Sequence, residues 1–173
     1  MSFPNLAFSR NKFERHPSFL LDHVIVWFYR ALAKRYLPEK GTRWLRQQIA
    51  SANTVIVSRL TLVEVMSAVA RRHREGAINT HVMQGINRLL ERHFQNDYAV
   101  VDVNDKLTRE AIQLITKHPL RAYDSVQLAS ALLVNQRLVA QKLAPITFLC
   151  SDTRLLQIAS SEGLLTDDPN NYV

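Results

Sequence analysis

Short apolar runs alternate with longer amphipathic stretches along most of this chain. Apolar runs of strand length occupy residues 24–28, 55–57, 98–103 and 146–150, and a short fifth run occupies residues 164–166. Between them, apolar residues recur with the helical period, which predicts helices at residues 31–37, 42–51, 61–75, 80–94, 105–118, 121–143 and 153–162. Strands separated by helices predict an α/β domain with a mostly parallel sheet and helices on both faces.

This periodicity is absent before residue 24. Residues 1–23 contain Pro4 and Pro17, and we interpret them as an irregular N-terminal extension that precedes a single domain at residues 24–173. No apolar run approaches the roughly 18 to 20 residues of a membrane span, and the N-terminus lacks the apolar core of a signal peptide. We therefore expect a cytoplasmic protein with no membrane partner.

The segment at residues 120–132 carries an acid on an apolar face. On a helical period, Asp124 shares its stripe with Leu128, Ala131 and Leu132. A carboxylate in such surroundings has to be paired, protonated or bound to a cation, because its desolvation is costly. The simpler alternative is an acid in the first helical turn after Pro119, where it interacts favourably with the helix dipole.

Two further acids follow predicted strands. In parallel α/β sheets, ligands bind outside the carboxyl ends of the strands, and Glu64 and Asp152 come after the runs at 55–57 and 146–150. Glu64 has an alternative role in a capping box that begins at Thr61, and Asp152 has one as a helix N-cap. If Asp124 points to the same place, three carboxylates converge, and their mutual repulsion favours a bound Mg²⁺ or Mn²⁺ suited to phosphoryl chemistry.

Composition narrows the classes of function. The net charge of +7 favours a polyanionic partner such as RNA or DNA, or an acidic protein, although solvated surface charge remains an alternative. A single cysteine, Cys150, excludes an internal disulfide and a cysteine-based zinc site. The four glycines are not clustered, which argues against a glycine-rich nucleotide-binding loop. The adjacent acids that a phosphoacceptor receiver domain needs after its first strand are not evident either.

Three segments of the chain resemble the PIN-domain ribonucleases, and within them the VapC type of toxin from bacterial toxin–antitoxin pairs. They are residues 57–65, 121–129 and 148–156, supported by Ala159 and by Gly163 with Leu164. The resemblance extends over about Ala31 to Asn170. It implies a three-layer α/β/α PIN-like domain that acts as a metal-dependent endoribonuclease hydrolysing RNA phosphodiesters. It also implies a homodimer and a small antitoxin that blocks the active site.

The resemblance assigns site residues by position. Glu64, Asp124 and Asp152 match the second, third and fourth acids of the family, which bind Mg²⁺ or Mn²⁺ and carry catalysis. For phosphate contacts we select Arg121 and Lys34, with Arg35, Arg59, Arg71 and Arg72 as further candidates near the ends that carry the acids. Such contacts position an RNA strand without reading its sequence, and plain surface charge is the alternative for each of them.

The first acid of the family is absent from its expected position. The family's first strand ends in Asp followed by two small residues, whereas this chain has Phe28, Tyr29 and Arg30. Asp22 precedes Phe28 by six residues and, at about 3.3 Å per residue, lies about 20 Å away along the strand. Either the first 30 residues arose by a frame change or an altered start in the gene, or the chain is a divergent member. In the second case the protein is a catalytically weakened or inactive PIN-like domain that binds RNA or an antitoxin.

Overall fold

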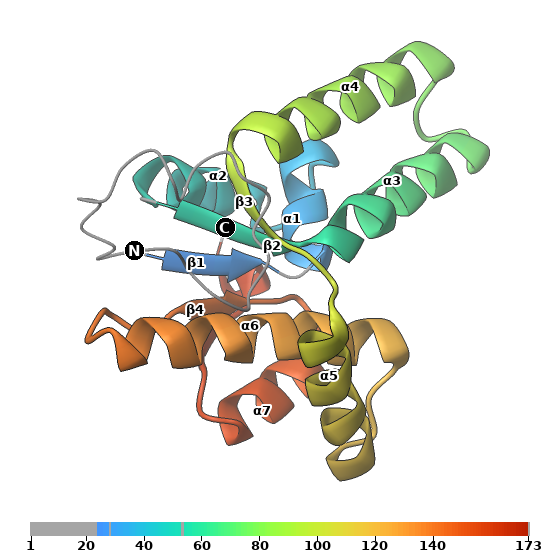
Figure 1. The fold of residues 1–173 in the computed structure, drawn as a ribbon. Helices are drawn as coiled ribbons and strands as arrows, with labels where there is room; N and C mark the ends of the chain where they lie inside the picture. The colour runs from blue at the N-terminus through green and yellow to red at the C-terminus, as the bar shows by residue number, and fades with distance from the viewer. Residues whose placement is uncertain (1–23, 28, 53, 173) are drawn as a thin grey trace.

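Five parallel strands form one sheet at the centre of the molecule (Figure 1). The computed structural model describes residues 24–27, 29–52 and 54–172, so the predicted extension at residues 1–23 and Phe28 lie outside the described residues. The strands are β1 Val24–Trp27, β2 Thr54–Ser58, β3 Tyr98–Val101, β4 Thr147–Leu149 and β5 Leu165–Asp167. Their order is β3-β2-β1-β4-β5 and every pairing is parallel, which confirms the predicted sheet.

The helices follow the predicted order, with shifts at their ends. They are α1 Tyr29–Tyr36, α2 Thr42–Ser51, α3 Arg59–Arg74, α4 Thr80–Asn96, α5 Asp105–Lys117, α6 Ala122–Ala140 and α7 Thr153–Ser161, with a 3-10 turn at Pro169–Asn171. Helix α3 begins two residues before the predicted start at Thr61, because Ser58 closes β2 and its side chain accepts a hydrogen bond from the backbone N–H of Leu60. No helix in the described part of the chain is both long and apolar enough to cross a membrane.

Successive side chains of each strand point to opposite faces of the sheet, and this alternation divides the apolar core into two clusters. Ile56 and Ala99 belong to a cluster formed with α5, α6 and α7, whereas Val57 and Val100 belong to a cluster formed with α1 to α4. Figure 1 shows these helices on opposite sides of the sheet. The predicted three-layer α/β/α architecture is therefore confirmed.

The order of the strands changes direction between β1 and β4. The chain passes from β1 to β2 and β3 on one side of the sheet, whereas β4 and β5 lie on the other side of β1. Such a reversal of direction is where parallel α/β proteins bind ligands, outside the carboxyl ends of the strands. Trp27 pairs with Leu149, so β1 and β4 end side by side at this point of the sheet.

The C-terminal segment packs against the start of α2. Gly41, with φ +82°, is the N-cap of α2 and lies against the backbone of Pro169. The rings of Trp44 and Tyr172 stack with centroids 4.0 Å apart, and the Tyr172 hydroxyl donates to Asp167 Oδ2 at 2.9 Å. These contacts hold the segment after β5 against the start of α2.

We expect Gly41→Ala to destabilise the protein. An added Cβ would lie 2.1 Å from the carbonyl oxygen of Pro169, and the left-handed backbone alone costs a non-glycine residue about 1 to 2 kcal/mol. The free energy of unfolding in urea should fall by more than about 2 kcal/mol. Gly85 within α4 has open space around its Cα, so Gly85→Ala should stabilise by up to about 1 kcal/mol. Equal effects of the two substitutions would contradict the packing of Gly41 against Pro169.

Candidate functional site

The carboxyl-terminal edge of the sheet carries Glu64 on its α3 side. Because α3 follows β2 without a loop, Glu64 lies in the second turn of the helix, close to the end of the strand. Its side chain is half-buried. The N-cap of α3 is Ser58, so the capping box that was predicted to begin at Thr61 does not form.

Glu64 instead contacts α6 through Gln127. The side-chain amide nitrogen of Gln127 donates to Glu64 Oε2 at 2.6 Å and to the Thr61 hydroxyl oxygen at 2.9 Å. The Thr61 hydroxyl lies 3.2 Å from Gln127 Oε1, to which it donates. Gln127 and Thr61 are both buried. The carboxylate of Glu64 is therefore held by a residue that is 63 positions away in the chain.

Asp124 lies in the first turn of α6, three residues before Gln127. It is half-buried, and Leu128 and Ala131 on the same stripe are fully buried. The structure thus combines the two sequence interpretations, because the acid lies on an apolar face and also at the positive end of the helix dipole. Residues three apart on a helix share a face, so Asp124 and Gln127 are directed toward the same side of α6.

Asp152 follows β4 and caps α7. Its Oδ1 accepts a hydrogen bond from the backbone N–H of Leu155 at 3.2 Å, which confirms the predicted N-cap role. The backbone N–H of Asp152 is 3.2 Å from the sulfur of Cys150, which is fully buried. Beside it, the Ser151 hydroxyl oxygen is buried and has no hydrogen-bond partner among the described residues. An acid and an unpaired hydroxyl thus lie together at the end of β4.

These acids supply the kind of ligand atom that a hard cation binds. Carboxylate oxygens are the donors that Mg²⁺ and Mn²⁺ accept. Within residues 24–27, 29–52 and 54–172, however, no group of three or more His, Cys, Asp or Glu side chains is placed to hold a metal ion. The described residues therefore do not form a complete metal site.

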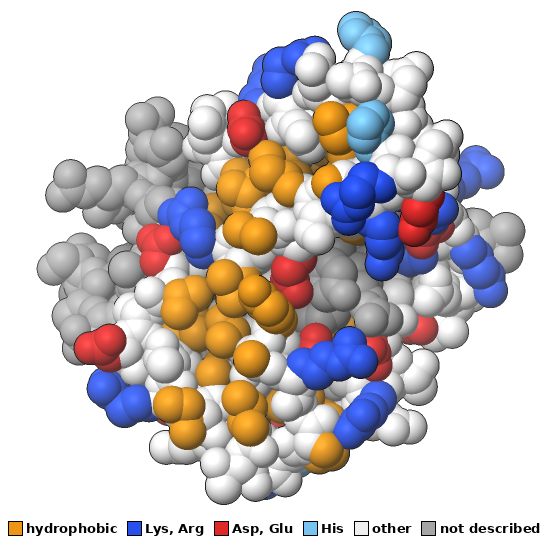
Figure 2. All heavy atoms as spheres, turned by 90° about the vertical axis from the view of Figure 1, so that its right-hand side faces the viewer, with side chains coloured by type: hydrophobic (Ala, Val, Ile, Leu, Met, Phe, Trp, Pro, Cys, Tyr) orange, Lys and Arg blue, Asp and Glu red, His pale blue; other side chains and the backbone are white. Residues whose placement is uncertain are grey.

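The face of the molecule that contains this edge is divided by charge and polarity. Figure 2 looks along the strands from their carboxyl ends and shows acidic side chains in the middle, between hydrophobic side chains on the left and basic ones on the right. Among the selected cations, Arg121 is exposed as the N-cap of α6. Arg59 pairs with Asp102, with Nη2 and Oδ1 2.6 Å apart. Positive charge thus borders the acids.

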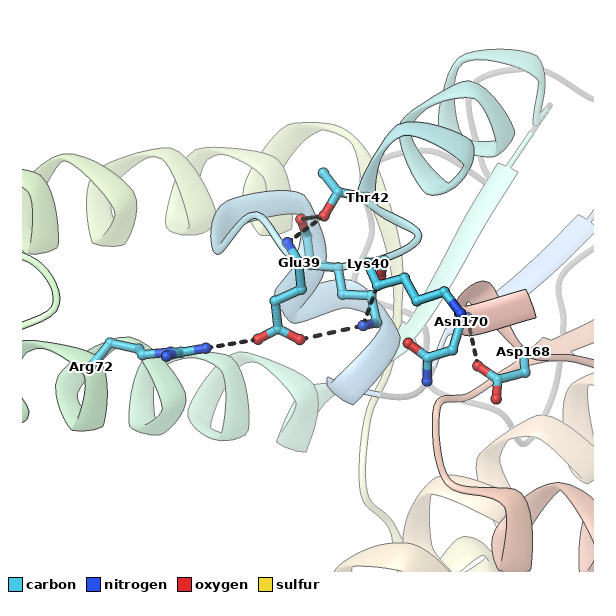
Figure 3. A network of polar contacts seen from close by, with 7 residues as sticks. Glu39, Lys40, Thr42, Arg72, Asp168 and Asn170 are labelled. Atoms are coloured by element: carbon cyan, nitrogen blue, oxygen red, sulfur yellow. Dashed lines mark hydrogen bonds and ion pairs between the residues drawn. The ribbon is translucent and has the colours of Figure 1, made fainter. Parts of the chain in front are cut away.

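Lys34 was selected for RNA contact, but the structure gives it a structural role. Its side chain is only 5% exposed, and its ammonium donates to the carbonyl oxygen of Lys40 at 3.0 Å and to Glu39 Oε2 at 3.3 Å. Glu39 also pairs with Arg72 at 3.2 Å, so it links α1 and α3 (Figure 3). The ammonium of Lys34 is thus buried among internal partners, and its contact with RNA stays a prediction.

Arg35 is likewise committed to internal contacts. Its guanidinium donates to the Tyr98 hydroxyl and lies 3.3 Å from His93 Nε2, while the Tyr36 hydroxyl lies 2.7 Å from His93 Nδ1. Burial, followed by the positive charge of Arg35, lowers the pKa of His93. Burial also raises the pKa of Tyr98. These shifts favour the neutral forms of His93 and Tyr98 beside the Arg35 guanidinium, between α1, α4 and β3.

Gln127 is the residue that sequence reasoning missed. Its signal in the sequence was a long polar side chain one helical turn after Asp124, within an otherwise apolar segment. That signal does not identify its partner, because Glu64 lies on another helix.

Comparison with known proteins identifies the fold independently. The model of the PIN domain family matches residues 23–142 of this chain. The comparison with curated proteins found no sequence that matches this chain.

Three solved structures resemble this one. FitAcB from Neisseria gonorrhoeae has a TM-score of 0.57 and 15% identity, with 84% of this chain and 97% of the other covered. VapC20 from Mycobacterium tuberculosis, described as a toxin that cleaves the sarcin–ricin loop, has a TM-score of 0.55 and 14% identity, with 82% and 96% covered. VapBC2 from Rickettsia felis, bound to a DNA fragment from its promoter, has a TM-score of 0.52 and 14% identity, with 84% and 98% covered. At such identities the likeness shows a shared fold.

Substitution of Asp152 should show how much its helix cap contributes to the stability of the protein. Asp152→Ala removes the acceptor for the Leu155 N–H and should lower the free energy of unfolding by about 1 kcal/mol, whereas Asp152→Asn keeps an equivalent cap. Asn104→Ala, which removes the N-cap of α5 outside the site, is the matched control and should cost a similar amount. Denaturation in urea followed by circular dichroism measures all three. If Asn and Ala at position 152 were equally destabilising, the capping role would be refuted.

Proposed function

This chain belongs to the PIN domain family, and we propose that it is an endoribonuclease, the toxin of a toxin–antitoxin pair, that hydrolyses RNA phosphodiesters. The proposal is carried by the placement of Glu64 and Asp124 on two helices that Gln127 links at the carboxyl-terminal edge of the sheet. It is supported by the match to the family model over residues 23–142. VapC20, which shares the fold, is described as a toxin that cleaves the sarcin–ricin loop.

Glu64, Asp124 and Asp152 are the acids that we propose for catalysis and for binding Mg²⁺ or Mn²⁺. All three lie on elements that begin at this edge, namely α3, α6 and the cap of α7. Oxygen-only ligands suit either cation. We assign no reaction step to the cation, because the described carboxylates do not form a complete group.

Arg121 is the residue that we propose for contact with the RNA backbone. It is exposed at the first turn of α6, three positions before Asp124. The net charge of +7 supports binding to a polyanion. Phosphate contacts of this kind weaken as the salt concentration rises, and they position a strand without selecting its sequence.

An antitoxin and a second copy of the chain are the proposed protein partners, with the cytoplasm as the place of action. VapBC2 and a toxin–antitoxin complex from Klebsiella pneumoniae share the fold, the latter with a TM-score of 0.50. Helix α5 exposes Ile112 at 57% and Ile115 at 43% of their surfaces, and these two side chains are neighbours on one face. Exposed apolar neighbours of this kind are typical of an interface between proteins.

A second candidate function is a weakened or inactive domain that binds RNA or an antitoxin. The observation that favours it is the sequence at the end of β1, where Phe28 stands in place of the first acid. Loss of one ligand weakens metal binding. Even loss of a residue that only hydrogen-bonds to a metal ligand commonly lowers metal affinity or activity by about 10- to 100-fold.

Purified protein should cleave RNA when Mg²⁺ or Mn²⁺ is supplied, and Asp124→Asn should abolish this cleavage. Asn keeps the volume of the side chain but removes its negative charge, so the expected loss exceeds about 100-fold. Cleavage of a fluorescent RNA, measured with the cation and with EDTA, tests the expectation. Asn104→Ala is a matched control, because it weakens a helix cap without touching the site.

Absence of cleavage in the wild-type chain would select the second candidate. The combined substitution Phe28→Asp, Tyr29→Ser and Arg30→Ser then restores the family pattern at the end of β1. Gain of metal-dependent cleavage in that variant would identify Phe28 as the cause of inactivity. Cleavage by the wild type that persists in Asp124→Asn would refute the assigned site.

The chain should be a dimer that depends on α5. Ile112→Glu combined with Ile115→Glu places two charges in the exposed apolar face and should convert the dimer to a monomer in light scattering. Val139→Glu is the matched control. Val139 is also an exposed apolar residue, at 52%, but it lies at the C-terminal end of α6 and not on α5. A wild-type monomer, or a dimer that survives the α5 substitutions, would contradict this interface.

A further inference from the structure

A pair of buried polar residues connects the two helical layers above the end of β2. Thr61 belongs to α3, which packs on one face of the sheet, and Gln127 belongs to α6, which packs on the other. Thr61 is fully buried and Gln127 is 2% exposed. Their side chains exchange hydrogen bonds of 2.9 and 3.2 Å. We call this pair the Thr61–Gln127 bridge.

The bridge determines which atom of Gln127 meets Glu64. An ionised carboxylate can only accept hydrogen bonds, so the atom of Gln127 that lies 2.6 Å from Glu64 Oε2 has to be the amide nitrogen. The carbonyl oxygen of the same amide then turns to the Thr61 hydroxyl, which donates to it. Every polar atom of the Gln127 amide is thus engaged, and the side chain has one orientation.

The spacing along the two helices relates the bridge to both acids. Thr61 precedes Glu64 by three residues on α3, and Asp124 precedes Gln127 by three residues on α6. Residues three apart lie on one helical face, so each acid lies one turn away from a member of the bridge. The bridge therefore sets how the acid-bearing turns of α3 and α6 face one another.

We propose that Gln127 is the positioning residue for Glu64: anchored by Thr61, its amide holds the Glu64 carboxylate in the orientation that RNA cleavage requires. Gln127 is buried and does not touch the RNA. The inference rests on the proposed ribonuclease function for its effect on cleavage, whereas the orientation of Glu64 can be observed without it. Hydrogen bonds that orient a functional carboxylate are commonly worth about 10- to 100-fold in activity.

The experiment uses the full chain and three variants. Gln127→Met keeps the length of the side chain but removes its donors, and Thr61→Val keeps the shape of threonine but removes the hydroxyl that anchors the amide. Gln136→Met is the matched control, because Gln136 is an exposed glutamine on the same helix. Melting temperatures are measured for each, and all rates are taken well below the lowest of them.

Two readouts are taken from each variant. The first is kcat and KM on a fluorescent RNA with Mg²⁺, where Gln127→Met should lower kcat about 10- to 100-fold with little change in KM. Thr61→Val should give a smaller decrease, and Gln136→Met none. The second readout is the carbon NMR signal of the Glu64 carboxylate, assigned by its loss in Glu64→Gln. This signal should move in Gln127→Met and Thr61→Val and stay in place in Gln136→Met.

The two readouts separate the two proposals. If the wild type does not cleave RNA, the ribonuclease function fails, and a Glu64 signal that moves in Gln127→Met still supports the positioning of Glu64. A Glu64 signal that does not move overturns the positioning role, whether or not the protein is active. So does an unchanged kcat of Gln127→Met in an active protein. If Gln127→Met does not fold, Thr61→Val decides by the same criteria.

Discussion

Parallel pairing of β1 between β2 and β4 is the constraint on which the rest of this structure depends. A parallel neighbour cannot be reached through a tight turn, so consecutive strands are joined by crossovers that contain helices. These helices cover both faces of the sheet, and every strand ends at the same edge. The start of α3 and the cap of α7 therefore meet at one edge, although they lie about 90 positions apart in the chain.

The acids at this edge are held by the protein itself. A half-buried carboxylate is costly unless it is hydrogen-bonded, and Glu64 obtains its bond from Gln127 while Asp152 obtains one from the first turn of α7. The same side chains thus support the helices and provide candidate ligands. This double role explains why helix capping and metal binding could both be inferred for Asp152, and why substitutions there need separate measurements of stability and activity.

The positive charge of the chain is less available to a polyanion than its total suggests. Lys34 is buried against Glu39 and the Lys40 carbonyl, and Arg35 supports a cluster of His93 and two tyrosines. Arg59 and Arg72 are each paired with an acid. Arg121 remains exposed beside the proposed site, so the contribution of charge to RNA binding depends on where each cation lies rather than on the sum.

Local patterns in the sequence were sufficient for the elements and for the class of fold. Helix α2 spans residues 42–51 as predicted, and the sheet is parallel, because hydrophobic period and helix-terminating residues act over a few positions. The sequence also placed Asp124 on the apolar face of its helix. It did not reveal the start of α3, the burial of Lys34 or the partner of Glu64. The partner of Glu64 is Gln127, 63 positions away in the chain, and only the order of the strands and the packing of helices on both faces bring these two residues together.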